Sequence, residues 1–425
     1  MGPIPVTPLP YATDHPQRKV PYVTYSILAV NILVFASFWN YIFSYYPHIK
    51  GFLDPWAFSV SHPNLITLFT HAFIQIDPFH LLGNMLLLWL VGRVLEDGLG
   101  HTLFTLFYFA SLVMATLLYG IIERTFMPGA MDASLIGASG AISGVMGLAA
   151  FRFYRLRVRT IPILTICCLP IPIPVKFWVP FWIYAVYFAV KEVYAGVMQI
   201  STVSIGHFNI DVPEDHVAHW AHIGGLLLGV LAAFMLDSVK EGKRGYALED
   251  ATKAVNEGIP ANASMQQLEE ILRERPNDPE VLEAISALAM YNGDQEKSRQ
   301  FSIRLLQVCL RAHENARAVS TYLSLLYAFP DTVLPAKEQL AIASTLEGSM
   351  HYQESAQAFG LVIEHYPQSR EAENALLRSA QLHHRYLRDS TSAKYMLEAL
   401  LQDFPGSPWE SLARERLREI EKNTR

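Results

Sequence analysis

Long apolar runs alternate with short polar segments through the first 240 residues of the chain. Six such runs lie at about residues 22–46, 79–95, 102–122, 139–154, 177–197 and 217–237. Several approach the ~20 residues that an α-helix needs to cross a hydrocarbon core of ~30 Å. The first run is too long for a cleavable signal peptide, so we expect it to remain as a membrane anchor. The pattern predicts an all-α bundle of six transmembrane helices over residues 21–238.

Beyond residue 262 the pattern changes to short helices with a repeat. The segments "HYPQSREAENALL" and "DFPGSPWESLARERL" share an aromatic–Pro–x–Ser turn, and Pro330, Pro367 and Pro405 are 37 and 38 residues apart. Helix–turn–helix units with periods in the mid-thirties are typical of a solenoid. Residues 263–425 therefore resemble, weakly, a tetratricopeptide-like soluble helical-repeat domain; an irregular helical bundle is the alternative.

Two polar segments flank the apolar region. Residues 1–20 are rich in proline and are predicted to be a disordered cytoplasmic arm. Residues 239–262 are charged at first and then rich in Asn, Gly and Ala, which indicates a linker between the membrane and soluble domains.

The charged residues are distributed as this division requires. The chain has 33 Lys and Arg and 39 Asp and Glu, of which 24 lie in residues 1–240 and 48 after them. The net charge of -6 and the lack of a basic aromatic patch argue against a nucleic-acid partner. Cys167, Cys168 and Cys309 form neither a metal-ligand spacing nor a disulfide framework, so we expect unpaired thiols and no metal or other cofactor.

Basic residues mark one side of the predicted bundle. The ends of the runs on that side carry Arg18, Lys19, Arg152, Arg155, Arg157, Arg159, Lys176, Lys240, Lys243 and Arg244. The other side offers only Lys50, Arg124 and Lys191. By the positive-inside rule both termini are cytoplasmic. We expect a multi-pass protein of a cell membrane, namely a bacterial inner membrane.

Polar residues inside the runs fall at a common depth. Ser139 lies 13 residues before Arg152, or ~20 Å of helical rise, and His222 lies 15 residues before Asp237, or ~22 Å. Asn84 and His80 lie 12 and 16 residues before Glu96, or ~18 and ~24 Å. Three helices thus place a serine, a histidine and a His/Asn pair in one layer of the outer third of the membrane.

The segment around Ser139, "LIGASGAISGVMG", has two interpretations. Small residues such as Gly140 and Gly144 allow two transmembrane helices to approach closely. They also clear space around a nucleophile, and the common depth favours this second interpretation. A serine hydroxyl needs a base to take its proton, for which His222 is the candidate. Because no Asp or Glu is found near His222 in the same layer, the sequence predicts a Ser/His dyad rather than a triad.

His80 and Asn84 stand at positions i and i+4 and so share one helix face. Both side chains can donate hydrogen bonds to a developing oxyanion, together with the backbone N–H of Ser139. Taken singly, Asn84 is more often a contact between helices and His80 a satisfied core histidine. Their common depth with Ser139 favours a role in catalysis.

The segments "FTHAFIQIDPFHLLGNMLLLWLVGRVLED", "GASGAISGVMG" and "AHWAHIGGLLLG" resemble, in this order, the signature segments of rhomboid intramembrane serine proteases. The resemblance covers about residues 20–238. It implies that Ser139 is the nucleophile, His222 the general base, and His80 and Asn84 oxyanion-hole side chains. It also implies cleavage of transmembrane segments near their outer ends, with water reaching a cavity opened from that face.

Two positions depart from the family pattern. Gln75 stands where some members have a further histidine, and Ser143 stands where some have an aromatic ring that stacks on the catalytic histidine. Something else must then hold the ring of His222, or the ring is held more loosely. We predict a serine endopeptidase whose partners are transmembrane substrates, the lipid bilayer and a cytoplasmic protein or peptide that binds the repeat domain. The alternatives are a non-proteolytic receptor or chaperone for membrane clients, and an anchor for the repeat domain.

Overall fold

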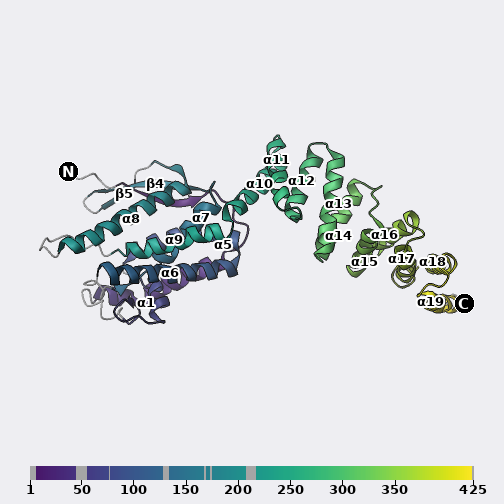
Figure 1. Ribbon diagram of the computed structural model, residues 1–425, viewed down its shortest axis with the longest axis horizontal. Coiled ribbons are helices and arrows are strands. Elements are labelled where there is room, and N and C mark those ends of the chain that lie inside the picture. The colour runs from purple at the N-terminus through teal and green to yellow at the C-terminus, as the bar shows by residue number, and fades with distance from the viewer. Residues whose placement is uncertain are drawn as a thin grey trace. The chain divides into compact units, whose positions relative to one another are not determined.

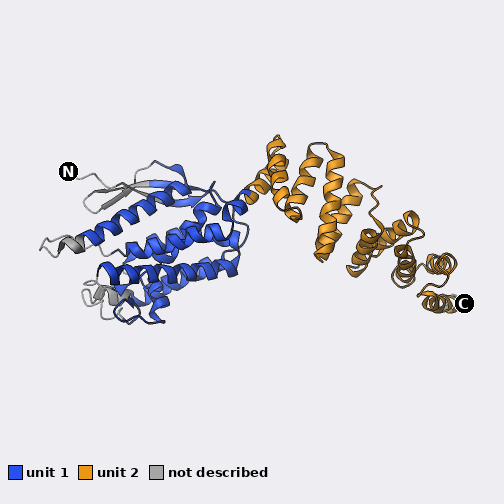
Figure 2. Ribbon diagram, viewed as in Figure 1, with its two compact units in different colours: residues 1–243 blue, residues 244–425 orange. Residues whose placement is uncertain are grey.

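The computed structural model describes residues 6–44, 55–75, 77–127, 134–166, 169–172, 175–206 and 217–423. The chain divides into two compact units, residues 1–243 and 244–425 (Figure 2). Cys167 and Cys168 lie outside the described residues, and Cys309 is a buried free thiol.

The helices of the first unit coincide with the six apolar runs (Figure 1). They are α1 (Tyr22–Ser44), the continuous α4 (Pro78–Leu87), η2 (Leu88–Gly92) and α5 (Arg93–Leu99), then α6 (His101–Phe126), α7 (Ser139–Arg152), α8 (Phe181–Gly206) and α9 (His219–Met235). Within the described residues, three stretches are long and apolar enough to span a membrane by themselves: Pro78–Leu99, His101–Phe126 and Phe181–Ser201. Helix α9 reaches that length together with the following α10, and α1 contributes the shorter apolar Tyr22–Phe38. The predicted helical, multi-pass membrane fold is confirmed.

A small sheet accompanies these helices, which the apolar pattern did not predict. Strands β1 (Val6–Thr13), β4 (Arg157–Ile166) and β5 (Leu169–Pro172) lie side by side in this order, and β6 (Phe177–Pro180) also pairs with β4. Strand β1 runs antiparallel to β4, with Val6 opposite Leu164 and Thr13 opposite Val158. The prediction of a disordered arm at 1–20 was therefore wrong for residues 6–13. Proline is tolerated there because β1 is an edge strand.

Four shorter elements also belong to the described part of the first unit. They are α3 (Thr67–Thr70), the 3₁₀ turn η1 (His71–Phe73) and the two-stranded ribbon of β2 (Phe58–Ser59) and β3 (Ser134–Leu135). The backbone N–H of Gly137, two residues after β3, donates to the carbonyl of His71 at 2.8 Å. These short elements therefore tie the segment before α4 to the segment before α7.

Small residues bring α6, α7 and α9 into backbone contact. A Cβ atom added to Gly225 of α9 would overlap the carbonyl oxygen of Gly140 in α7. One added to Gly140 would lie 2.7 Å from the Cβ of Ala115 in α6. The glycines near Ser139 thus do serve close helix packing, and this packing is what brings the start of α7 against the start of α9.

At the other end of the bundle, Glu96 of α5 holds the first turn of α1. Its carboxylate accepts hydrogen bonds from the backbone N–H of Val23 at 2.9 Å and of Thr24 at 2.8 Å. Arg152, at the end of α7, donates to the carbonyl of Gly98 at 2.8 Å. Glu96 is almost completely buried. It is therefore a helix cap inside the bundle rather than an interfacial charge.

The second unit is a row of helices in which, from α11 onward, each packs against the next. The helices are α10 (Ser238–Glu257), which begins in the first unit, α11 (Asn262–Glu274), α12 (Pro279–Tyr291), α13 (Gln295–Arg311), α14 (Asn315–Ala328), α15 (Ala336–Gly348), α16 (Tyr352–His365), α17 (Arg370–Leu382), η4 (His383–Leu387), α18 (Ser390–Asp403) and α19 (Glu410–Asn423). The predicted linker at 239–262 is mostly helix α10. Its residues Ala247, Ala251 and Ala254 are buried in the core of this unit, so the prediction of a linker was wrong there.

An ion pair fixes α10 to the start of α12. The guanidinium of Arg244 donates to both carboxylate oxygens of Asp278, at 2.5 and 2.9 Å, and Asp278 also caps α12 by accepting from the N–H of Glu280 and of Val281. Burial acts to raise the pKa of Asp278, but the hydrogen bonds and charge of Arg244, with the two N–H donors, lower it below its usual range.

Candidate active site

The start of α7 faces the start of α9 across a single hydrogen bond. The hydroxyl of Ser139, the first residue of α7, lies 2.8 Å from Nε2 of His222. Ser139 is half-buried and His222 is buried. The first N–H groups of a helix have no acceptor within it. The beginning of α7 therefore presents backbone donors beside the hydroxyl.

His80 comes to the same place from α4. That helix begins at Pro78 and is capped by Asp77, whose carboxylate accepts from the N–H of Phe79 and of His80. A Cβ added to Gly137 would lie 2.9 Å from Cε1 of His80 and 3.7 Å from the hydroxyl oxygen of Ser139. Gly137 has φ +108°, a conformation that favours glycine. The absence of a side chain there lets the imidazole of His80 approach Ser139.

Asn84 lies one turn further along α4, and its amide is held by a chain of hydrogen bonds. Nδ2 of Asn84 donates to Oε1 of Gln75 at 2.8 Å, and Nε2 of Gln75 donates to Oδ1 of Asn31 at 2.9 Å. All three side chains are buried. The structure thus brings Ser139, His222 and His80 together and places Asn84 beside Gln75, which fixes its orientation.

A carboxylate touches His222, contrary to the expectation from the sequence. Oε2 of Glu192, on α8, lies 2.7 Å from Nδ1 of His222 and 2.7 Å from Nδ1 of His219. Its other oxygen, Oε1, lies 3.4 Å from Nζ of Lys191. Glu192 is 1% exposed. The prediction that no Asp or Glu lies near His222 was wrong.

The ring of His222 is also held by a neighbour that the sequence did not reveal. Phe188, one turn before Glu192 on α8, has its ring centroid 5.8 Å from that of His222. The hydroxyl of Ser143 points elsewhere and donates to the carbonyl of Ser139 at 2.8 Å. The aromatic neighbour of His222 therefore comes from α8 instead of α7.

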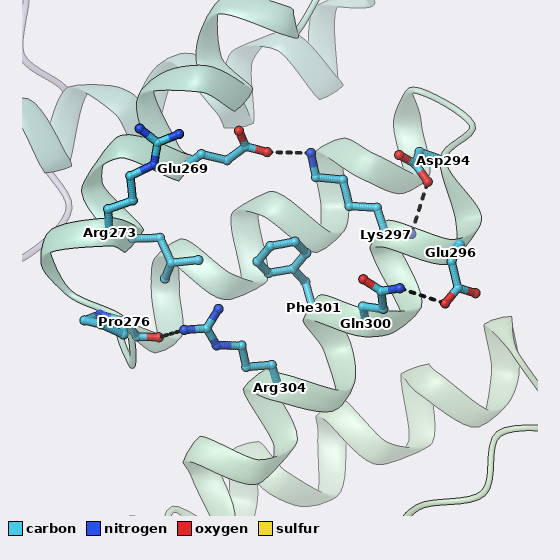
Figure 3. Close-up of a pocket in the computed structure, with 10 residues that line it drawn as sticks. Glu269, Arg273, Pro276, Asp294, Glu296, Lys297, Gln300, Phe301 and Arg304 are labelled. Atoms are coloured by element: carbon cyan, nitrogen blue, oxygen red, sulfur yellow. Dashed lines mark hydrogen bonds and ion pairs between the residues drawn. The ribbon is translucent and has the colours of Figure 1, made fainter.

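The repeat unit contains a pocket of about 730 Å³ between α11 and α13, drawn in Figure 3. Lys297 pairs with Glu269, Arg304 donates to the carbonyl of Pro276, and Phe301 lies between these two pairs (Figure 3). None of the ten residues lining the pocket is a serine, cysteine or histidine. This pocket offers a surface for binding and no nucleophile–base pair.

The fold and the site define a polytopic helical membrane protein with a serine–histidine pair between two of its helices. Comparison with known families agrees: residues 62–238 match the family model of the rhomboid domain, and residues 374–407 match that of a tetratricopeptide repeat. The rhomboid protein 1, mitochondrial, of Saccharomyces cerevisiae is 26% identical over 254 residues, which are 58% of this chain and 61% of that protein. The match thus spans about three fifths of that relative. The resemblance seen in the three sequence segments is confirmed.

Proposed function

We propose that the first unit is an intramembrane serine endopeptidase that cuts transmembrane segments of other proteins near their outer ends. The observation that carries this proposal is the 2.8 Å separation between the hydroxyl of Ser139 and Nε2 of His222. A rhomboid domain over residues 62–238 supports the substrate class. An ionisable residue such as His222 inside a helical membrane bundle is costly and is normally retained for function.

The proposed reaction is acyl transfer in two steps. Ser139 Oγ attacks the scissile carbonyl carbon while His222 Nε2 takes the hydroxyl proton, and His222 then gives that proton to the leaving amine. Water hydrolyses the resulting ester, again with His222 as base, and frees Ser139. His80, the N–H of Ser139 and Asn84 are the proposed donors to the oxyanion. One N–H of the Asn84 amide is bound to Gln75, which leaves its second N–H for the oxyanion.

Labelling with a fluorophosphonate tests the chemistry directly. The wild-type protein in detergent should be modified at Ser139, and Ser139→Ala should be neither labelled nor active on a fluorogenic transmembrane peptide. His222→Ala should be as inactive as the double variant, because members of one catalytic unit are not additive. If folded Ser139→Ala protein cleaves the peptide at the wild-type rate, the proposal is wrong. A folded wild-type protein that is neither labelled nor active would instead be better described as a receptor or chaperone for membrane clients.

We also propose that both termini lie on the cytoplasmic side of a cell membrane, as the basic residues near Arg152 and Lys176 favour. A cysteine introduced at residue 210, between α8 and α9, should react with an impermeant thiol reagent from outside intact cells. A cysteine introduced at residue 258 should react only after permeabilisation. The opposite pattern would place the site of Ser139 towards the cytoplasm.

The proposed role of the second unit is to bind a cytoplasmic protein or peptide. Repeat solenoids present extended surfaces to such partners, and the pocket around Phe301 is one candidate surface. Truncation after residue 243 should leave cleavage of the generic peptide in detergent intact and impair processing of the natural client in cells. Loss of activity on every substrate by a folded truncated protein would assign the unit a part in catalysis.

A further inference from the structure

The carboxylate between α8 and α9 is the least expected group in the membrane unit. Glu192 carries a carboxylate within an apolar helix that is long enough to span the membrane, and its side chain is only 1% exposed. A buried carboxylate is unfavourable unless hydrogen bonds or opposite charges compensate for lost hydration. Here two imidazole nitrogens, from His219 and His222, converge on the one oxygen Oε2. A contact this costly, against the base of the proposed dyad, calls for a function.

We propose that Glu192 is a positioning residue that converts the Ser139–His222 pair into a Ser–His–Glu triad. This proposal rests on the proposed protease function. A carboxylate accepts hydrogen bonds and donates none, so Nδ1 of His222 must carry the hydrogen in the 2.7 Å contact. Nε2 then keeps its lone pair and can accept the proton of Ser139. Glu192 thereby selects the reactive tautomer of His222 and stabilises the imidazolium that forms, without taking the proton itself.

His219 supplies the second anchor for this carboxylate. It lies one turn before His222 on α9, and its Nδ1 shares Oε2 of Glu192 at 2.7 Å. The contact between Lys191 Nζ and Oε1, 3.4 Å, holds the other oxygen of the group. With both oxygens engaged, the carboxylate has little freedom to rotate away from His222. His219 is therefore expected to act on the reaction through Glu192.

The same three side chains also suit a transition-metal ion, and the distances distinguish the two possibilities. Their ligand atoms all lie within 4.8 Å of one another. Bonds of ~2.0–2.1 Å to a tetrahedral Zn²⁺ place neighbouring ligand atoms about 3.3 Å apart. Both O···N separations are 2.7 Å, which is the length of a charge-assisted hydrogen bond. The arrangement is that of a hydrogen-bonded carboxylate.

The decisive variant is Glu192→Gln. The side-chain amide should turn its oxygen towards the cation of Lys191 and its NH₂ group towards the histidines, which forces Nδ1 of His222 to accept. Nε2 would then carry the hydrogen and could not take the proton of Ser139. We expect kcat to fall by ~10³–10⁴-fold with little change in KM, as for the corresponding loss in other triads. Glu192→Asp keeps the acceptor and should recover much of the rate.

Three readouts separate positioning from a purely structural role. Thermal unfolding in detergent reports folding, the rate of fluorophosphonate labelling reports the reactivity of Ser139, and ¹⁵N spectra of histidine-labelled Ser139→Ala protein report the tautomer of His222. Glu123→Gln, which removes a buried carboxylate of α6, is the matched control and should leave kcat unchanged. In the spectra, the hydrogen of His222 should move from Nδ1 to Nε2 when Glu192→Gln is added.

The outcomes are distinct. A folded Glu192→Gln protein that keeps kcat within about tenfold of wild type, with unchanged labelling, would overturn the triad. If that variant does not fold, two other measurements decide. A hydrogen on Nε2 of His222 in the Ser139→Ala protein would overturn the proposal. So would a folded Glu192→Asp protein that does not recover the rate. If a chelator abolishes the activity of the wild-type protein, the three side chains bind a metal ion and the proposed hydrogen bonds are wrong. Activity that survives Ser139→Ala would instead refute the serine mechanism on which this proposal rests.

Discussion

Close packing of α7 on α9 sets the distance between Ser139 and His222, and Gly225→Ala tests this. A Cβ at this position of α9 would lie 3.0 Å from the carbonyl carbon of Gly140, would come closer still to its oxygen, and would lie 3.1 Å from the nitrogen of Gly144. Ordinary contact begins at 3.4 Å. These helices must therefore separate by at least ~0.4 Å, because backbone atoms cannot move aside as a flexible side chain can.

The expected consequence follows from where the separation occurs. His222 lies one turn before Gly225 on α9, and Gly140 follows Ser139, so the movement lengthens the contact that is now 2.8 Å between the hydroxyl and Nε2. A 0.4 Å displacement along this direction leaves ~3.2 Å, beyond the usual range for a hydroxyl donor. Since a misplacement of ~1 Å can cost ~10² in rate, we expect kcat to fall by about 10- to 100-fold. Overpacking should also lower stability by ~1–3 kcal/mol.

The assay compares kcat and KM on a fluorogenic transmembrane peptide with the labelling rate of Ser139 and with Tm in detergent. Gly120→Ala is the matched control, since the space around the Cβ position of this glycine in α6 is open. It should leave kcat and Tm near their wild-type values. The reasoning is refuted if Gly225→Ala protein is as active and as stable as the wild type, because the distance between nucleophile and base would then not depend on this contact.

Three further predictions concern other parts of the molecule. Gln75→Leu removes the partner of the Asn84 amide and should lower kcat by up to ~10²–10³, the value of one oxyanion donor; adding Asn84→Ala should cost little more. In the fragment 238–425, Asp278→Asn keeps a residue that can cap α12 but removes the negative charge that pairs with Arg244. It should lower the free energy of unfolding in urea by ~1–3 kcal/mol near pH 7. Because the pKa of Asp278 is lowered on folding, this difference should be present above pH ~4 and disappear as the pH falls through the folded value. Phe359→Ala should destabilise the same fragment by ~3–5 kcal/mol.

Each of these three predictions can be contradicted by a specific result. Tyr327, 92% exposed on α14, is the match for the fully buried Phe359, and its change to alanine should shift stability by less than ~0.5 kcal/mol. A difference between wild type and Asp278→Asn that persists unchanged at low pH would exclude the ion pair as its source. Full activity of Gln75→Leu would mean that Asn84 does not act on the oxyanion, or does not need this partner.

The depth of the candidate catalytic residues could be predicted from the sequence because helical rise is constant. Counting from charged ends placed Ser139, His222 and His80 in one layer, and the structure brings these three together. The same arithmetic could have found the carboxylate. Glu192 is five residues before the end of the run 177–197, and His222 is five residues after the start of the next run. The proximity of Lys191 to a span end concealed this.

Depth does not determine which side of a helix faces which neighbour. Whether Glu192 faces His222 or lipid depends on the rotation of α8 about its axis, which is set by contacts with α9 and not by spacing within either segment. The pairing of β1 with β4 joins residues about 150 positions apart, and no local pattern specifies such a partner. The helix α10 likewise looked like a linker because its few buried residues are alanines, whose small side chains give a weak apolar signal until a core surrounds them.

The sequence by itself therefore determined the helical membrane fold, the repeat unit and the layer that holds Ser139 and His222, because these depend on hydropathy and on constant helical rise. Only the tertiary structure decided that glycine contacts bring α7 onto α9, that Gln75 orients Asn84, and that Glu192 holds Nδ1 of His222. Those features are contacts between separate helices. Their geometry follows from how side chains of different segments fill one another's space, which no single segment encodes.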